Sequence, residues 1–142
     1  MIKKEIIYKD GDIELLGYIA MPDNLSKPTP AVMVAPEWWG HNSYVRKRAE
    51  DIAALGYIGF AIDMYGKNVT ADNPTDASAL SDPFFKDRRL MRARAHAALE
   101  TLKQQPHVDA ARLGAMGYCF GGTACLEMAR AGVLVNLVMW AF

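Results

Sequence analysis

The chain has 142 residues, of which 51% are hydrophobic and 23% are charged. This length is typical of one domain, residues 1–142, and the apolar content suits a packed core rather than a disordered chain. The 16 basic and 16 acidic side chains cancel to a formal net charge of zero. The balance argues against a nucleic-acid partner, because a dedicated nucleic-acid surface needs a basic patch.

The N-terminal segment MIKKEIIYKDGD carries charges at once and has no apolar stretch of signal-peptide length. The longest apolar run, residues 133–142, is about half as long as a bilayer span and contains Asn136. We therefore expect a cytoplasmic protein without membrane contact. Cys119 and Cys125 are six positions apart, which fits neither a redox C-x-x-C pair nor a zinc-ligand pair, so both are expected to be free thiols and no metal site is predicted.

The N-terminal part predicts a hairpin followed by a buried strand. Residues 2–8 and 13–21 are β-prone runs on either side of the turn signal Asp10-Gly11, a pattern typical of an antiparallel hairpin. After a proline-containing loop, Ala31–Ala35 (AVMVA) is continuously apolar. Such a run indicates a strand that is covered on both faces.

The next segment predicts a helix and a second buried strand. Asn42 or Ser43 can cap a helix over residues 44–55, which ends at Gly56 in the position of a left-handed C-terminal cap. Residues 57–62 (YIGFAI) then form another apolar run. The pattern is therefore strand, helix, strand.

Residues 67–83 are polar and contain the turn signals Asn73-Pro74 and Asp82-Pro83. They predict a long loop, with at most a short helix within it. Residues 84–105 show the longest helical periodicity in the chain and predict one continuous helix.

The C-terminal part predicts a strand over residues 112–118, a small-residue helix over 120–130 and a further strand over 134–142. The full order of elements is then β-β-β-α-β-α-β-α-β. Strands that alternate with helices imply right-handed crossovers, so the fold class is α/β, with a mainly parallel sheet and helices on both faces.

The motif GYCFGG places Cys119 between a predicted strand and a predicted helix. Its G-x-C-x-G spacing matches the G-x-S-x-G nucleophile turn, with cysteine in place of serine. A nearby helix N-terminus favours the thiolate, and the amide of Phe120 would point at a developing oxyanion. We predict a catalytic thiol, against the alternative of a buried structural cysteine; Cys125 is expected to lie in the core.

The motif APEWWG follows the first buried strand and contains Glu37 beside Trp38 and Trp39. In this kind of fold the turn after that strand supplies the second oxyanion amide. A fixed negative charge opposes an oxyanion, so Glu37 makes more sense as an acid–base partner of the thiol than as a stabiliser. The alternative is a surface carboxylate in a loop.

Together, APEWWGHN, Arg46, LGYIGFAIDMYG and GYCFGG make the chain resemble the dienelactone hydrolase family of α/β-hydrolases, from about residue 31 to residue 132. The resemblance implies a hydrolase that cleaves a small ester or lactone through a thioester on Cys119. It further implies that Glu37 holds and activates the thiol, that the amides of Trp38 and Phe120 form the oxyanion hole, and that no cofactor is used.

Two features bear on the substrate. The family's type member uses an arginine in the long loop to bind a substrate carboxylate, whereas residues 67–83 here contain Lys67 and no arginine, so a different ester or lactone is as well supported as the dienelactone. Five basic residues also crowd the start of the next predicted helix: Lys86, Arg88, Arg89, Arg92 and Arg94. We expect them to form a solvated face rather than an anion site.

The fold normally orders its catalytic groups as nucleophile, acid and histidine. The residues after Cys119 contain no Asp and no His, so we expect a domain that lacks its C-terminal strands and helices. His41 is a weak candidate for a substitute base. Asp63 is expected to order the DMYG turn rather than to act as the acid of a triad.

A second function class stays open beside the hydrolase. In it the chain is a domain that binds ligand or associates with a partner chain without turnover. A terminal strand leaves an open sheet edge, so a homodimer or strand swap through residues 134–142 is expected. A dinucleotide-binding domain is disfavoured because no G-x-G-x-x-G follows a strand.

Overall fold

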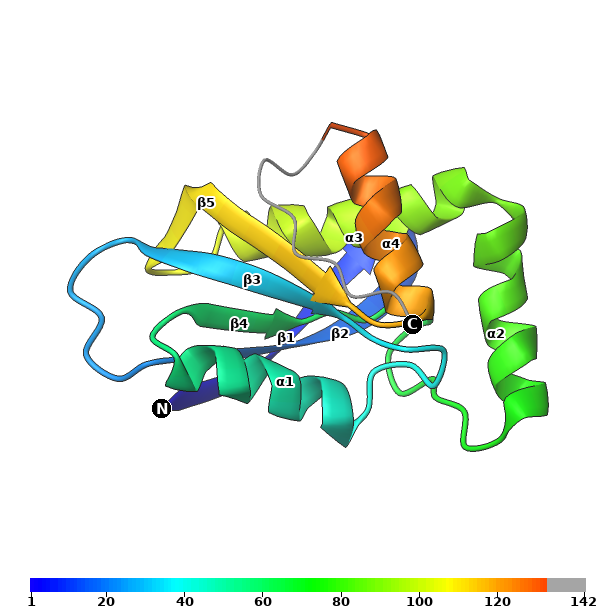
Figure 1. Ribbon diagram of the computed structural model, residues 1–142, viewed down its shortest axis with the longest axis horizontal. Coiled ribbons are helices and arrows are strands. Elements are labelled where there is room, and N and C mark those ends of the chain that lie inside the picture. The colour runs from blue at the N-terminus through cyan, green and yellow to red at the C-terminus, as the bar shows by residue number, and fades with distance from the viewer. Residues whose placement is uncertain (133–142) are drawn as a thin grey trace.

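The computed structural model describes residues 1–132 of the chain (Figure 1). The elements of this part, in chain order, are β1 (Ile2–Asp10), β2 (Ile13–Met21), β3 (Thr29–Ala35), α1 (Ser43–Ala54), β4 (Ile58–Ala61), α2 (Pro74–Lys86), α3 (Arg88–Lys103), β5 (Val108–Gly117) and α4 (Phe120–Arg130). The strand predicted over residues 134–142 lies outside the described residues. Within residues 1–132, every helix is too short or too polar to cross a lipid bilayer.

The strands form one mixed sheet in the order β1-β2-β4-β3-β5. β1 and β2 pair antiparallel along their whole length, from Ile2 with Met21 to Asp10 with Ile13, which confirms the predicted hairpin. β2 also pairs antiparallel with β4, while β3 pairs parallel with both β4 and β5. The continuously apolar strand β3 is thus an inner strand, as its sequence indicates.

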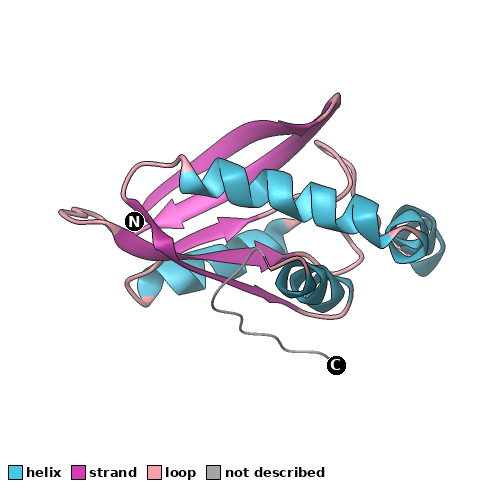
Figure 2. Cartoon of the chain, turned by 90° about the horizontal axis from the view of Figure 1, so that it is seen from above, coloured by secondary structure: helices cyan, strands magenta, loops and turns pink. Residues whose placement is uncertain are grey.

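Helices cover both faces of the sheet, which confirms the predicted α/β architecture (Figure 2). Successive residues of β3 point to opposite faces, so Met33 joins the larger core beneath α3 and α4, and Val34 joins a smaller core. In the smaller core Val34 packs near Val45 and Ala49 of α1. This arrangement brings the carboxyl ends of β3, β4 and β5 to one edge of the molecule.

The segment between β4 and β5 differs from the prediction. The expected loop over residues 67–83 contains most of α2, and the expected single helix over 84–105 is divided at Asp87. The Asn73 side chain accepts a hydrogen bond from the Asp76 amide at 3.0 Å, and Pro74 occupies the first helical turn. Asn-Pro therefore begins a helix here, because proline's fixed φ suits the first helical position as well as a turn.

The basic cluster between Lys86 and Arg94 is not a uniformly solvated face, so that prediction is wrong in part. Arg94 is only 5% exposed, donates to Asp10 at 2.9 Å and to the Met64 carbonyl at 2.6 Å, and joins α3 to the hairpin. Arg92 donates to the buried carboxylate of Glu127 at 2.8 Å and joins α3 to α4. Lys86 and Arg89 fit the expectation, since both are exposed, Arg89 with 89% of its side chain.

Candidate active site

The turn between β5 and α4 holds Cys119 in an uncommon backbone conformation. Cys119 is the N-cap residue of α4, with φ 53° and ψ −119°, and its side chain is exposed. Positive φ at a non-glycine residue costs of order 1–3 kcal/mol and is concentrated at functional sites. The predicted strand–turn–helix context of the GYCFGG motif is confirmed, and its sharp turn presents the sulfur to solvent.

Backbone hydrogen bonds of the first turn of α4 fix the turn that contains Cys119. Thr123 donates its amide to the Cys119 carbonyl at 3.1 Å, and the Gly121 amide donates to the Tyr118 carbonyl at 2.9 Å. Phe120 is the first residue of the helix, where an amide has no acceptor within the helix itself. The positive end of the helix dipole thus lies next to the thiol of Cys119.

Two glycines of the motif allow this turn to pack tightly. A Cβ added to Gly117 would lie 2.5 Å from the carbonyl carbon and oxygen of Gly121, and one added to Gly121 would lie 2.6 Å from the Pro36 carbonyl oxygen. Neither position tolerates a side chain without movement of the backbone. Because Gly117 and Gly121 have no side chains, the loop after β3 packs directly against the start of α4.

The loop after β3 begins with a β-turn over residues 37–40, closed by the Gly40 amide, which donates to the Glu37 carbonyl at 3.1 Å. Trp38 and Trp39 are its central residues, and their rings meet edge to face at 5.3 Å. The Trp38 carbonyl accepts from the Tyr65 hydroxyl at 2.9 Å, and the Trp39 carbonyl accepts from the Ala71 amide at 3.0 Å. The loop after β4 therefore holds the tryptophan turn in place.

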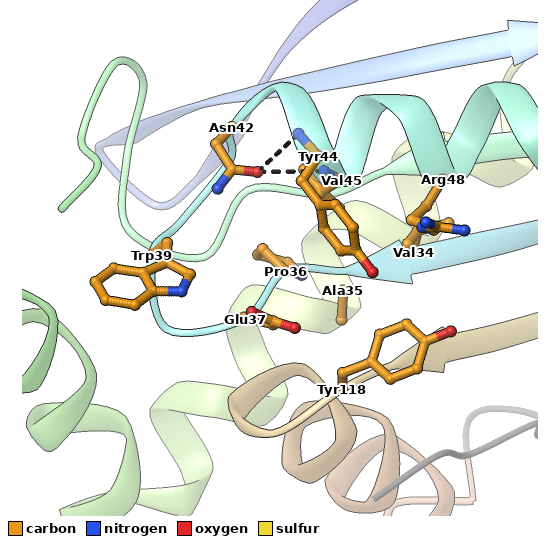
Figure 3. A pocket seen from close by; sticks show the side chains of 10 residues that line it. All are labelled: Val34, Ala35, Pro36, Glu37, Trp39, Asn42, Tyr44, Val45, Arg48 and Tyr118. Carbon is orange, nitrogen blue, oxygen red and sulfur yellow. Dashed lines mark hydrogen bonds between the residues drawn. The ribbon is translucent and has the colours of Figure 1, made fainter. Parts of the chain in front are cut away.

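A cavity of about 400 Å³ opens beside this turn, between the end of β3 and the start of α1 (Figure 3). The side chains of Glu37, Tyr44 and Tyr118 converge on it. Tyr118 directly precedes Cys119, so the cavity adjoins the nucleophile turn. Among residues 1–132, no hydrogen bond joins the Glu37 carboxylate to the Cys119 thiol, and the activating role of Glu37 stays a prediction.

Both ring nitrogens of His41 are occupied by other groups. Nδ1 lies 3.1 Å from the Ile62 carbonyl, and Nε2 accepts from Arg46 Nε at 3.1 Å. Burial lowers the pKa of His41, and the nearby Arg46 guanidinium lowers it further. The geometry fits a neutral imidazole that donates through Nδ1 and holds the loop to β4, rather than a base directed at Cys119.

The other histidines lie away from the nucleophile turn. His96 is on the exposed side of α3, 3.7 Å from Glu100, and His107 is in the turn before β5, at the opposite end of that strand from Cys119. With His41 engaged elsewhere, the three histidines of the sequence leave Cys119 without an imidazole partner. Among the described residues, no three His, Cys, Asp or Glu side chains gather as a metal site.

Asp63 orders the DMYG turn, as expected from the sequence. Its carboxylate accepts from three amides: Tyr65 at 3.0 Å, Gly66 at 3.1 Å and Leu16 of β2 at 3.0 Å. The residue is fully buried. A carboxylate with three backbone donors has little capacity left for a histidine, so its role is structural.

Two further residues of the sequence analysis are placed by the structure. Cys125 is buried in α4, and burial raises the pKa of its thiol to about 12, which agrees with the predicted core position. Lys67, the only basic residue of the loop in question, forms an exposed ion pair with Glu14 at 2.9 Å. Tyr65, in contrast, was not singled out by the sequence analysis, although it links Trp38 to Phe120.

A thiol on a strand-to-helix turn, at the carboxyl edge of an α/β sheet, defines an α/β-hydrolase-type protein. The model of the family described as "Dienelactone hydrolase family" matches residues 15–141. The chain belongs to the dienelactone hydrolase family. It is 32% identical over 130 residues to a putative carboxymethylenebutenolidase of Aquifex aeolicus (strain VF5), covering 86% of this chain and 53% of that protein.

A probable 2-oxo-3-(5-oxofuran-2-ylidene)propanoate lactonase of Bradyrhizobium sp is 33% identical, over 81% of this chain and 46% of its own length. Among solved structures, the chain named m3DLH has a TM-score of 0.93 and 39% identity, over 99% of this chain and 59% of its own. A dienelactone hydrolase-like promiscuous phosphotriesterase from metagenomic libraries has a TM-score of 0.92 and 36% identity, over 98% and 58%. The chain spans about half the length of the curated relatives it matches.

Proposed function

We propose that the chain carries the nucleophile and the oxyanion hole of a dienelactone hydrolase-type site. In this site Cys119 attacks a small ester or lactone and is itself acylated. The observation that carries the proposal is the backbone of Cys119, whose φ of 53° presents an exposed sulfur at the N-terminus of α4. A cysteine with a purely structural role does not require a strained, solvent-exposed turn. The family membership of the chain agrees with this reading.

The proposed step begins when the Cys119 thiolate attacks the carbonyl carbon and the carbonyl π electrons move to oxygen. The amides of Trp38 and Phe120 are proposed to stabilise the resulting oxyanion. When the carbonyl re-forms, the bond to the leaving alcohol oxygen breaks, and that oxygen takes a proton from water or from an adjacent acid. The product is a thioester on Cys119, and Glu37 is the proposed acceptor of the thiol proton in the resting state.

The substrate class follows from the cavity beside the turn. A volume of about 400 Å³ suits a small molecule, and the lining combines aromatic side chains with the carboxylate of Glu37 and the guanidinium of Arg48. Relatives of this chain are named as a carboxymethylenebutenolidase and a lactonase, so a small ester or lactone is the proposed substrate. An arginine at the cavity wall would suit a substrate that carries a carboxylate.

The experiment is a stopped-flow measurement of p-nitrophenol release from p-nitrophenyl acetate, followed by the intact mass of the protein. We expect one equivalent of rapid release and one added acetyl group on Cys119. Cys119→Ala should abolish both, while Cys125→Ala, which removes the buried thiol, should leave both intact. An acetyl group on any other residue, or no burst from the wild-type chain, would overturn the proposal.

The same traces address turnover. No described histidine faces Cys119, so for these 142 residues we propose that the thioester is resolved slowly and that release stops near one equivalent. Sustained turnover that depends on Cys119 would show that a base is present and that the slow step is wrong. Binding of the ester without acylation would favour the second function class, a ligand-binding domain without turnover.

A further inference from the structure

Tyr65 contacts both residues whose amides are proposed to form the oxyanion hole. Its hydroxyl donates to the Trp38 carbonyl at 2.9 Å, and its ring lies 5.6 Å from that of Phe120. We propose that Tyr65 is a positioning residue that fixes the separation of the Trp38 and Phe120 amides. The inference rests on the proposed function and adds a residue to it.

Tyr65 is suited to this role because its own backbone is fixed. Its amide donates to Asp63 Oδ1 at 3.0 Å, and the other carboxylate oxygen of Asp63 accepts from Leu16 of β2 at 3.0 Å. The Tyr65 ring is packed between Phe84 of α2, at 5.8 Å, and Phe120. Because both the backbone and the ring of Tyr65 are held, its hydroxyl can fix the position of the Trp38 carbonyl.

The hydrogen bond acts on the turn beside a second bond from the same loop, in which the Ala71 amide donates to the Trp39 carbonyl. The Trp38 carbonyl belongs to the central peptide of the turn over residues 37–40, so its direction sets the rotation of the turn. Without the hydroxyl, residue Trp38 loses a bond to the rest of the protein, so the position of the whole residue, including its amide, is less fixed. An oxyanion donor must lie about 2.7–3.1 Å from the oxyanion, so a small rotation is sufficient to weaken it.

The Tyr65 hydroxyl also stays protonated and so remains a hydrogen-bond donor. Burial raises the pKa of Tyr65 well above its usual range and outweighs a hydrogen bond with Ser81 that lowers it. Tyr65 therefore keeps its proton near neutral pH. The bond to the Trp38 carbonyl persists through the proposed reaction.

The test compares two reactions of the same sulfur in the Tyr65→Phe variant, which keeps the ring and removes the hydroxyl. Acylation by p-nitrophenyl acetate develops an oxyanion, whereas alkylation by iodoacetamide is a direct displacement at carbon and develops none. We expect acylation to slow by about tenfold or more, by weakening of one donor. Alkylation should change less than twofold, and Tyr57→Phe, at an exposed tyrosine, should change neither rate.

Equal acylation rates in the wild type and Tyr65→Phe would overturn the inference, as would an equal slowing of acylation and alkylation, which would point to the thiol or to general loosening. Circular dichroism melts of both proteins show whether the variant is folded under the assay conditions. If the variant is unfolded under these conditions, the test is hydrogen exchange at the Trp38 amide of the wild-type protein. Slow exchange of that amide supports a held turn, and exchange at the rate of an open loop overturns it.

Failure of the proposed function has a different signature. If wild-type Cys119 reacts with iodoacetamide but is not acylated by the ester, the hydrolase proposal fails and the role of Tyr65 fails with it. If the wild type is acylated and only the Tyr65 comparison is flat, the hydrolase proposal stands alone.

Discussion

The first turn of α4 touches the end of β3 at backbone distance: a Cβ on Gly121 would lie 2.4 Å from the carbonyl oxygen of Ala35. The contact joins the turn at Cys119 to the loop that bears Glu37 and Trp38. The separation of the two halves of the site is therefore set by a glycine and not by side-chain packing.

A methyl group at this contact should force the two halves apart. Gly121→Ala is expected to lower the free energy of unfolding by about 1–3 kcal/mol, the usual cost of overpacking, and to slow acylation of Cys119. Gly11→Ala is the comparison, because no atom lies within 4 Å of its added Cβ and only its φ of 58° opposes the change. Urea unfolding and ester acylation measure both effects, and a Gly121→Ala protein with wild-type acylation would contradict the spacing argument.

The buried guanidinium of Arg94 should contribute far more to stability than its neighbours in sequence. Arg94→Met removes the donors to Asp10 and to the Met64 carbonyl and is expected to cost roughly 2–3 kcal/mol, since Asp10 is left partly buried without its partner. Arg89→Met, in the same helix, removes an exposed pair with Asp87 and should cost less than about 0.5 kcal/mol. If urea unfolding showed that Arg94→Met and Arg89→Met lose similar amounts of unfolding free energy, the structural role of Arg94 would be contradicted.

Glu127 gives the chain a defined pH dependence. Burial by itself would raise the pKa of Glu127, but hydrogen bonds from Arg92 and Arg130 outweigh it and hold the pKa below its ordinary value of 4.5. The unfolded chain then binds a proton more readily than the folded one, so this carboxylate stabilises the fold fully above the unfolded pKa and progressively less as pH falls.

The comparison is urea unfolding of the wild type and Glu127→Gln. The advantage of the wild type should be constant from about pH 7 to about pH 5.5 and should shrink towards pH 3.5, below the unfolded pKa. An advantage that grew on acidification would mean that the pKa of Glu127 is raised in the folded protein.

The two thiols should be distinguishable without any substrate. At about pH 8, a thiol with a pKa near 12 is ionised to roughly one part in ten thousand, so buried Cys125 should not react with a disulfide reagent on the timescale of exposed Cys119. We expect one reactive thiol per native chain and two in guanidinium chloride. Two fast thiols in the native protein would show that α4 opens readily.

The turn at Cys119 could be predicted because its determinants are contiguous. Gly117, Cys119 and Gly121 lie within five positions, and the apolar strand and small-residue helix on either side are local patterns. The same holds for the hairpin, whose turn signal Asp10-Gly11 separates two strands of equal length. Local signals of this kind need no knowledge of the tertiary structure.

The division of residues 67–105 into two helices could not be decided in the same way. Asn-Pro begins turns as well as helices, and the choice here depends on the burial of Ala77, Ser81 and Phe84, which only the folded core supplies. The burial of Arg94 could not be predicted either, because a run of charges usually marks a solvated face and its partner Asp10 is 84 positions away. Tyr65 was missed for the same reason, since Trp38 is 27 positions away.

The bonds around Asp63 also bear on the order in which the site is assembled. The carboxylate of Asp63 binds the Leu16 amide, 47 positions earlier, and its backbone binds the Tyr8 hydroxyl, 55 positions earlier. Contacts so distant in sequence require long loops to close and form late in folding, whereas the turn at Cys119 is closed within a few residues. When the complete chain refolds, we therefore expect the turn at Cys119 to form early and the tryptophan turn to become fixed only when the N-terminal hairpin docks, so the two sides of the candidate site form in separate folding events.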